Sequence, residues 1–551
     1  MESSYIVVTN NYIATPKDGY FEFGNIDDDK KVDSYVEYAQ SFIEYAQSVG
    51  TLEPVPADRA STQNWTDKIP LDCSSIKDVQ FGGSSSPVAG DAVLLCYSVV
   101  TSIVHNGFFV QDPDSFGPAF SSFSSGIFIY VGNADKSSIS VGDPIIVEGT
   151  VSEYYGMTQI SSVTSPIVPS NASKMFLEPS VIALPVDDMF EFEQHEGMLV
   201  NFVSKSGDAL IISEYYNFDR FGEVRVCAAE AVNGRNYQFA ETNHPDKDGY
   251  SSHVDLIERS CVTIDDNSGA QNPNPALFGG IYTVASHSAF RGGDEVTTLG
   301  LQGPLFYSFG RWRVQPTKTN DLKVEAMNPR SDPPVLPEAH LKLAFANLLN
   351  YWTTVGYDSS LRGADTEVEF ERQTSKTIPA LSSLEADIIA VCELENVQEN
   401  VATHDLVDRL NEYENKVRGG HLAVFEAASV TAGYDLVGDD VIKVDVIYNK
   451  NKLELVGSAM LYDADVNPEI LSMSTTGAIF DGYSRVPLAA TFKTKDSGDF
   501  ITVVSNHYKS KGSYGITPTG GDADEGVGAA AWNLLRTLTS KALLDWLKTY
   551  P

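Results

Sequence analysis

Hydrophobic and polar residues follow a β-type pattern in the middle of the chain. From Ile76 to about Pro334, short apolar runs are separated by Gly, Pro, Ser and Asp, and almost no helical periodicity occurs. The predicted strands span 92–104, 107–111, 126–131, 144–151 and 198–203. Short strands at regular spacing are typical of a β-barrel or a β-sandwich.

After Glu338 the pattern alternates between strands and helices. The predicted strands span 386–393, 441–448, 488–492 and 500–505. The predicted helices span 372–384, 401–410 and 529–547, and Pro379 is expected to kink or shorten the first of them. Alternation of this kind favours a layered α/β domain with mixed sheets.

A length of 551 residues predicts several domains. The expected parts are an N-terminal segment of no assigned role (1–72), a first β domain (73–172), a second β-rich region with a linker (173–335) and an α/β domain (338–551). Aromatic residues at helical spacing predict a helix at 32–49 in the N-terminal segment, and prolines predict an extended linker at 329–337.

The chain is strongly acidic, with 38 basic and 75 acidic residues and a formal charge of −37. Such a charge repels nucleic acid and anionic membranes at long range, so a polyanionic substrate must meet a local basic patch or a bound cation. An acidic, salt-adapted or secreted surface explains the same charge without any specific role. No apolar stretch is long enough for a transmembrane helix.

The five cysteines show no close pairs, so the spacing of a zinc knuckle is absent. Cys73 with Cys96, and Cys227 with Cys261, are candidate disulfides in an oxidising compartment, but buried free thiols fit the sequence equally well. Cys392 lies inside an apolar run, which favours a small core residue.

Three apolar runs in the α/β stretch stop at polar residues that can handle metal and phosphate. The stops are Asn347, Glu393, and Asn506 with His507. An amide, a carboxylate and an imidazole at the ends of neighbouring strands can hold a divalent cation and protonate a leaving oxygen.

Short motifs occur in order across residues 75–548. In the β stretch they lie at 107–112, 125–130, 147–160, 196–200, 220–223 and 328–330. In the α/β stretch they lie at 345–351, 362–365, 392–396 (CELEN), 440–444, 506–512 (NHYKSKG) and 532–536. In their order and spacing the chain resembles the secreted nucleases of the endonuclease/exonuclease/phosphatase superfamily that carry an OB-fold-like β domain before the catalytic domain.

The resemblance implies an α+β four-layer sandwich for the last domain, and in-line hydrolysis of phosphodiesters with a divalent metal, usually Mg²⁺ or Mn²⁺ and sometimes aided by Ca²⁺. It implies that Glu393 is the metal carboxylate and that Asn347 is its amide neighbour. It also implies that His507, with Asn506 beside it, contacts the scissile phosphate and assists departure of the leaving oxygen.

Further site residues are predicted around this histidine. Strand alternation places Asp440 on the same face as Tyr448, so Asp440 is predicted to orient His507 and Tyr448 to contact phosphate. Lys509 and Lys511 are predicted to hold the nucleic-acid backbone. Arg536 is predicted to do the same, with local packing as the alternative.

The sequence departs from the pattern of this family in one respect. The family continues with a strand that ends in Gly-Asp-x-Asn, which orients the attacking water and the phosphate, and it closes with Ser-Asp-His. Neither motif is present in this sequence. We therefore expect a catalytic domain without its C-terminal part, and a chain that does not turn over unless a second chain completes it.

The predicted function is that of a metal-dependent extracellular DNA endonuclease with little sequence preference. RNA, a phosphorylated sugar or a phospholipid head group are other substrates for the same fold. The alternative function is a non-catalytic nucleic-acid or surface-binding protein, in which the β domain does the binding. The family is typically exported, so an extracellular or periplasmic location is expected, although the N-terminus lacks a signal-peptide pattern.

Overall fold

The computed structural model describes residues 73–549 except 82, 114–122, 165, 170–171, 229–235, 267, 273–290, 297–300, 318–322, 330–337, 357–361, 420–423 and 514. The chain divides into two compact units, Met1–Cys73 and Ser74–Pro551. The helix predicted at 32–49 and most of the predicted linker at 329–337 lie outside the described residues.

A closed five-stranded barrel follows the short elements β1 (Cys73–Ser74) and α3 (Ile76–Val79). Its strands are β2 (Ala92–Val104), β3 (Gly107–Gln111), β4 (Gly126–Tyr130), β5 (Pro144–Tyr154) and β6 (Met157–Ser161). They pair in the order β2-β3-β4-β6-β5, and β5 pairs back with β2, so the sheet closes on itself. Only β4 and β6 are parallel neighbours among these five strands. All four strands predicted in this region are confirmed, and β5 is longer than predicted.

The second β-rich region contains a nine-stranded sheet in the order β15-β12-β9-β10-β11-β14-β13-β8-β7. The strands are β7 (Ser180–Leu184), β8 (Leu199–Ser204), β9 (Leu210–Glu214), β10 (Val224–Ala228), β11 (Cys261–Ile264), β12 (Glu295–Val296), β13 (Gln302–Ser308), β14 (Arg311–Val314) and β15 (Val324–Glu325). The strand predicted at 198–203 is confirmed as β8. A disulfide joins Cys227 to Cys261, which are register partners in β10 and β11.

Helices are also present in this region, contrary to the prediction that it has almost none. They are α4 (Phe190–Glu193), α5 (Phe218–Phe221), α6 (Phe239–Thr242) and α7 (Lys247–Ser260). The 14-residue helix α7 was missed because it is rich in polar residues and mostly exposed, with only Ser260 buried, although its few apolar residues gather on one side. Its start is defined by Asp246, whose side chain accepts a hydrogen bond from the Gly249 N–H.

The last domain is built on two separate sheets. The first sheet has the order β16-β17-β19-β18, with β16 (Leu343–Tyr351), β17 (Ile388–Glu395), β18 (Phe425–Ala427) and β19 (Ile442–Asn449). The second has the order β20-β21-β22, with β20 (Leu453–Met460), β21 (Arg485–Thr494) and β22 (Phe500–His507). Strands β16 and β17 are parallel, and β17 and β19 are antiparallel, so the predicted mixed sheet is present.

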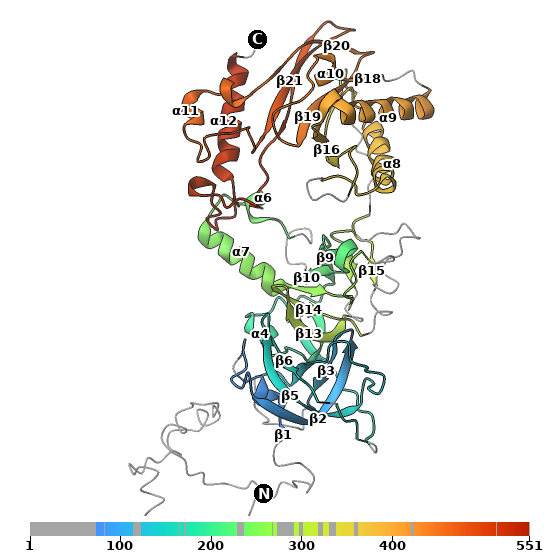
Figure 1. Cartoon of the computed structure of the whole chain (residues 1–551), viewed down its shortest axis with the longest axis vertical. Coiled ribbons are helices and arrows are strands. Elements are labelled where there is room, and N and C mark those ends of the chain that lie inside the picture. Colours follow the sequence, from blue (N-terminus) through green and yellow to red (C-terminus); the bar gives the residue numbers. More distant parts are fainter. Residues whose placement is uncertain are drawn as a thin grey trace, which may run out of the picture. The chain divides into compact units, whose positions relative to one another are not determined.

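Helices cover these sheets. They are α8 (Glu367–Ser383), α9 (Val401–Arg418), α10 (Ala428–Thr431), α11 (Pro468–Leu471) and α12 (Asn533–Thr549). Helices α8 and α9 lie together beside β16, and α11 and α12 lie beside β21 (Figure 1). Helix α8 passes through Pro379 without ending, so the predicted shortening is wrong. No helix in the described part of the chain is long and apolar enough to cross a membrane.

Two apolar cores hold this domain together. One contains Ile378 of α8, Leu406 of α9, and Ile389 of β17. The other contains Val444 of β19, Phe492 of β21 and several residues of α12. Strands β17 and β19 are buried along nearly their whole length, as expected for strands covered on both faces. Strand β17 therefore carries its polar end on a buried framework, whereas β16 and β22 are partly exposed.

Candidate active site

Glu393 lies near the end of β17, at the centre of the candidate site. Asn347 lies beside it on β16, and its Nδ2 donates a hydrogen bond to Glu393 Oε1 at 3.0 Å. The backbone N–H of Asn350 donates to Glu393 Oε2 at 3.1 Å. Each carboxylate oxygen therefore has a donor that fixes its direction, and both retain lone pairs that can bind a cation.

The backbone is bent where it presents this carboxylate. Glu393 has a positive φ of +62°, and φ is +53° at Leu349 and +54° at Asn350. The register between β17 and β19 shifts between Val391 and Leu394. Bulges and left-handed non-glycine residues cost free energy, and they recur at sites where a side chain must be re-aimed. Here they turn Glu393 toward the end of β22.

His507 approaches Glu393 from the second sheet. It is the last residue of β22, and its Nε2 lies 3.7 Å from Glu393 Oε1. The two sheets are tied together close to this point, because the Ser505 hydroxyl donates to the Val391 carbonyl at 3.0 Å. The structure thus brings together the amide, carboxylate and imidazole that the sequence placed at three strand ends.

Arg485 lies opposite His507 on β21 and was not singled out from the sequence. The two residues are register partners. Arg485 Nε lies 3.2 Å from Asp440 Oδ2, so Asp440 forms an ion pair with this arginine. The hairpin pairing of the predicted strands 488–492 and 500–505 was a signal that could have placed an arginine at 485 near His507.

The predicted contact between Asp440 and His507 is not formed. His507 Nδ1 is buried and has no hydrogen-bond partner among the described residues. The Asp440 carboxylate is occupied by Arg485 and by the backbone N–H of Ile442, at 3.2 Å. Asp440 is thus a correction to the predicted site: it neutralises the arginine beside His507 and does not hold the imidazole.

The surroundings of His507 lower the pKa of its imidazole. Burial is the main cause, and the positive charge of Arg485 adds to it, while Glu393 and Asp440 act in the opposite direction. The imidazole of the free site is therefore neutral at neutral pH. A phosphate group placed against it would favour the protonated form, because it adds negative charge.

Lys509 lies close to this group. Its Nζ lies 5.3 Å from the centre of the Trp532 ring, and burial together with the charges of Arg485 and Arg362 lowers the pKa of its amine. Lys511, by contrast, is exposed. The side chain of Asn506 donates only to the Val504 carbonyl of its own strand, at 3.4 Å, and no described contact links it to Glu393.

Two residues predicted to contact phosphate make other contacts in the structure. Tyr448 pairs with Ile388 at the far end of β17, where its buried hydroxyl donates to Glu426 at 3.0 Å. Strand alternation gave it the same face as Asp440, but the length of β19 separates the two. Arg536 donates to the backbone carbonyls of Ala531 and Ala529 at 2.6 and 2.9 Å, so it stabilises the start of α12.

The donor set at Glu393 fits a hard cation that keeps part of its water shell. Mg²⁺ is commonly held by one or two carboxylates with waters in the other positions, and Glu393 with the amide oxygen of Asn347 matches that pattern. The amide now turns its Nδ2 toward Glu393, and Asn347 Oδ1 accepts from the Leu349 N–H at 2.9 Å. No group of three or more His, Cys, Asp or Glu side chains placed to hold a metal occurs among the residues that the structure describes.

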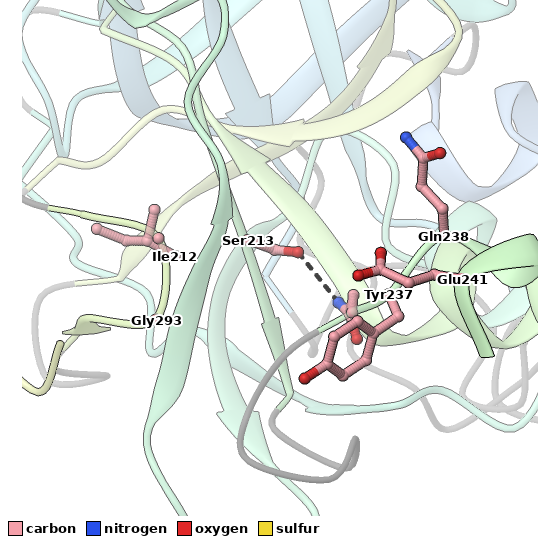
Figure 2. Close-up of a pocket in the computed structure, with 8 residues that line it drawn as sticks. Ile212, Ser213, Tyr237, Gln238, Glu241 and Gly293 are labelled. Atoms are coloured by element: carbon pink, nitrogen blue, oxygen red, sulfur yellow. Dashed lines mark hydrogen bonds between the residues drawn. The ribbon is translucent and has the colours of Figure 1, made fainter. Parts of the chain in front are cut away.

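Two pockets differ in charge. One of about 350 Å³ lies in the second β-rich region and is lined by Tyr237, Gln238 and Glu241, with Asn236 donating to Ser213 at 3.2 Å (Figure 2). No Lys or Arg lines it, so it does not suit an anionic substrate. The other, of about 660 Å³, lies beside Asn347 and is lined by several cationic side chains.

Comparison with known proteins gives little beyond this geometry. No protein-family model and no curated protein matches the sequence. The human Nocturnin catalytic domain with bound sulfate is 15% identical, with 33% of this chain and 52% of that chain covered and a TM-score of 0.20. D. rerio TDP2 complexed with a single-strand DNA product is 12% identical, with 38% and 56% covered and a TM-score of 0.21. ANGEL2, a 2′,3′-cyclic phosphatase, is 16% identical, with 25% and 32% covered and a TM-score of 0.16.

The chain spans about half of the Nocturnin and TDP2 chains and about a third of the ANGEL2 chain. The TM-scores are too low for these similarities to carry a functional argument. Function must therefore be inferred from the site.

Proposed function

We propose that this chain is a divalent-metal-dependent phosphodiester hydrolase that acts on nucleic acid, with DNA as the leading substrate. The observation that carries the proposal is the approach of His507 Nε2 to 3.7 Å from Glu393 Oε1, between the ends of strands from two different sheets. A fixed carboxylate and an imidazole with a lowered pKa, next to cationic side chains, form a group suited to metal-assisted phosphoryl chemistry.

Each residue has a separate role in this proposal. Glu393 and Asn347 hold the cation, which when bound neutralises charge on the phosphate. Arg485 and Lys509 add positive charge where negative charge grows during the reaction. Water attacks phosphorus in line with the leaving oxygen and loses a proton to solvent, the bond from phosphorus to that oxygen breaks, and His507, once protonated, gives its proton to the leaving oxygen.

The residue that orients the attacking water has no candidate among these groups. The sequence contains neither Gly-Asp-x-Asn nor Asp-His, the two motifs with which the resembling nucleases supply that function. On that ground the sequence predicted no turnover without a second chain, but because Asn347, Glu393 and His507 lie together we expect slow turnover by this polypeptide, measurable with protein near the concentration of the DNA.

The barrel supports a nucleic-acid substrate. Its closed strand order, with one parallel pair between β4 and β6, is the arrangement expected of an OB-type barrel, and such barrels present a face to single strands. The disulfide between Cys227 and Cys261 supports an extracellular or periplasmic location. Cys73 and Cys96 are also disulfide-bonded, whereas Cys392 is a buried free thiol.

Cleavage of supercoiled plasmid by the full chain, with Mg²⁺ plus Ca²⁺ or with Mn²⁺, tests the proposal. We expect nicking that is abolished by EDTA, by Glu393→Gln and by His507→Ala. Glu454→Gln is the matched control, because Glu454 is an exposed carboxylate on β20 and the change in charge is the same. Nicking that survives in Glu393→Gln would contradict the proposal. No nicking by folded wild-type protein would favour the alternative, a non-catalytic nucleic-acid or surface-binding protein.

A further inference from the structure

A cationic pocket adjoins the candidate active site. It has a volume of about 660 Å³, in the range of sites that hold a small ligand. It is lined by the end of β16, from Ala346 to Asn350, and by residues of α8. Asn347 lines the pocket and also donates to Glu393, so the pocket opens next to the proposed metal position.

Three cations line this pocket: Arg362, Arg372 and Lys376. Arg372 and Lys376 are four residues apart on α8, and therefore lie on the same side of the helix. Arg362 lowers the pKa of Lys509 and of Arg485, which places its charge near both of them. The cations thus extend from the vicinity of His507 along α8.

These cations are not used in the fold. No hydrogen bond or ion pair joins their side-chain nitrogens to any other described residue, and all three are exposed. Arg409 on the neighbouring helix α9 shows the contrast, because it pairs with Glu371 at 2.8 Å and with Asp405 at 2.9 Å. Glu369 is the one carboxylate that lines the pocket, and its Oε2 accepts from the Asp365 N–H at 3.1 Å.

Three cations outnumber the one carboxylate that lines the pocket and repel one another, and an anion would relieve that repulsion. This repulsion persists in a chain whose formal charge is −37, although acidic partners for a surface cation are abundant there. This placement favours a ligand that brings several negative charges.

The pocket also has an apolar wall. Leu349 lines it with 76% of its surface exposed and a positive φ of +53°. Gln373 donates to the Leu348 and Leu349 carbonyls at 3.2 and 3.0 Å, which holds this turn against α8. An exposed leucine in the same pocket as three cations suits a nucleotide, which has an apolar base and sugar face as well as a charged phosphate.

We propose that this pocket is a subsite for the nucleotide next to the scissile phosphate in a single nucleic-acid strand. Arg362, Arg372 and Lys376 bind backbone phosphates, and Leu349 contacts the sugar or base. This inference rests on the proposed function, because it takes Glu393 and His507 as the position of the scissile phosphate. It adds which side of that centre the strand occupies and that a single strand is bound.

The test is binding of a 5′-fluorescein-labelled 12-nucleotide single-stranded DNA with phosphorothioate linkages, followed by anisotropy in EDTA over a range of salt concentrations. The full chain is compared with Arg372→Ala/Lys376→Ala. The matched control is Lys416→Ala/Lys493→Ala, which removes two exposed lysines from α9 and β21. All four substituted residues are exposed, and thermal unfolding checks that each variant is folded.

We expect the pocket variant to bind at least about 10-fold more weakly at low salt. The slope of log K against log salt should fall in magnitude by about 1.4, which is two phosphate contacts at about 0.7 each. The control should stay within about twofold of wild type in affinity. Equal affinity of the pocket variant and the control, or no salt-dependent binding by wild type, would overturn the subsite.

Binding in EDTA is independent of catalysis, so the two proposals fail separately. Nicking that depends on Glu393, with equal binding by the pocket variant and the control, would remove the subsite and leave the hydrolase. Binding that depends on Arg372 and Lys376 without any nicking would remove the hydrolase. A duplex of the same length is the second probe, and tighter binding of the duplex than of the single strand would contradict the single-strand assignment.

Discussion

Arg485 and His507 face each other across the antiparallel strands β21 and β22, in the last register pair before β22 ends. The guanidinium of Arg485 also pairs with Asp440. The negative charge of Asp440 therefore offsets part of the positive charge that Arg485 places near the imidazole. Burial and this arginine lower the pKa of His507. The arginine, second to burial, therefore reduces the protonated fraction of the imidazole near neutral pH, and with it the readiness of His507 to act as an acid.

We expect Arg485→Gln to raise the pKa of His507. Removal of the positive charge favours the imidazolium, and Asp440 loses its partner and then acts on His507 more strongly. Histidine labelled with ¹³C, followed by NMR over a pH series, measures the shift, and His507→Ala assigns the resonance. Lys493→Gln on the same strand is the control. An unchanged or lower pKa in Arg485→Gln would contradict the role of the arginine.

The free energy of unfolding should depend on pH through His507. The pKa of His507 is lowered from 6.5 on folding, so the unfolded chain binds this proton more readily than the folded one. The stability that the neutral imidazole contributes is present above pH 6.5 and is lost as the pH falls toward the folded-state pKa. We expect His507→Gln to lose less stability than wild type between pH 7 and pH 5. An equal loss of stability in wild type and in His507→Gln between pH 7 and pH 5 would refute this.

Lys509 and Lys511 should differ in effect although they are two residues apart. Lys509 is half-buried beside Trp532, and burial together with the charge of Arg485 lowers the pKa of its amine, whereas Lys511 is exposed. We expect Lys509→Ala to slow plasmid nicking by roughly 10-fold or more and Lys511→Ala to change it by less than about twofold. Nicking rates measured at matched protein concentrations test this. A similar loss of rate in both variants would show that the charge of the loop matters more than the position of each lysine.

Gln373 should position Glu393 without touching it. Its side chain fixes the Leu348 and Leu349 carbonyls, and the next residue, Asn350, donates to Glu393 Oε2. We expect Gln373→Leu to weaken Mn²⁺ binding by about 10-fold, in the range found for residues that orient metal ligands. Its thermal unfolding should remain close to that of wild type. Unchanged Mn²⁺ affinity would assign Gln373 to packing alone.

A buried charge stabilises the same domain. The Lys443 side chain is fully buried, with Nζ 3.8 Å from Asp445 Oδ2 and donating to Asn400 Oδ1. We expect Lys443→Met to lower the free energy of unfolding by about 3–5 kcal/mol, because it leaves a buried carboxylate without its cation. Lys443→Met/Asp445→Asn should recover part of the loss. Urea unfolding followed by tryptophan fluorescence measures both, and equal losses in the two variants would contradict the charge argument.

The sequence predicted β17, β19, β21 and β22, and the first two are buried on both faces and form continuous apolar runs, but it did not predict β18 and β20. It also placed Asn347, Glu393 and His507 at strand ends that the structure brings together. Helix α7 was missed for the opposite reason, since it is mostly polar and exposed.

Contacts between elements were harder to predict. Strand alternation predicted one face for Tyr448 and Asp440, but Asp440 lies before β19 begins, and Tyr448 pairs with Ile388 at the far end of β17. The partner of Asp440 depends on which strand lies next to β22, and pairing of β21 with β22 placed Arg485 there. In the sequence, Arg372 and Gln373 are typical of the polar surface of a helix. Only the structure shows that the end of β16 lies beside them.

Mn²⁺ binding by the full chain tests the proposed catalytic centre most directly. It is measured as the loss of the free-ion signal in electron paramagnetic resonance. Wild type is compared with Glu393→Gln and with Glu454→Gln, which removes the same charge from an exposed position on β20. We expect one tight site in wild type and in Glu454→Gln, and its loss in Glu393→Gln. Equal Mn²⁺ stoichiometry and affinity in the two variants would show that Glu393 holds no metal, and the proposed catalytic centre would be wrong.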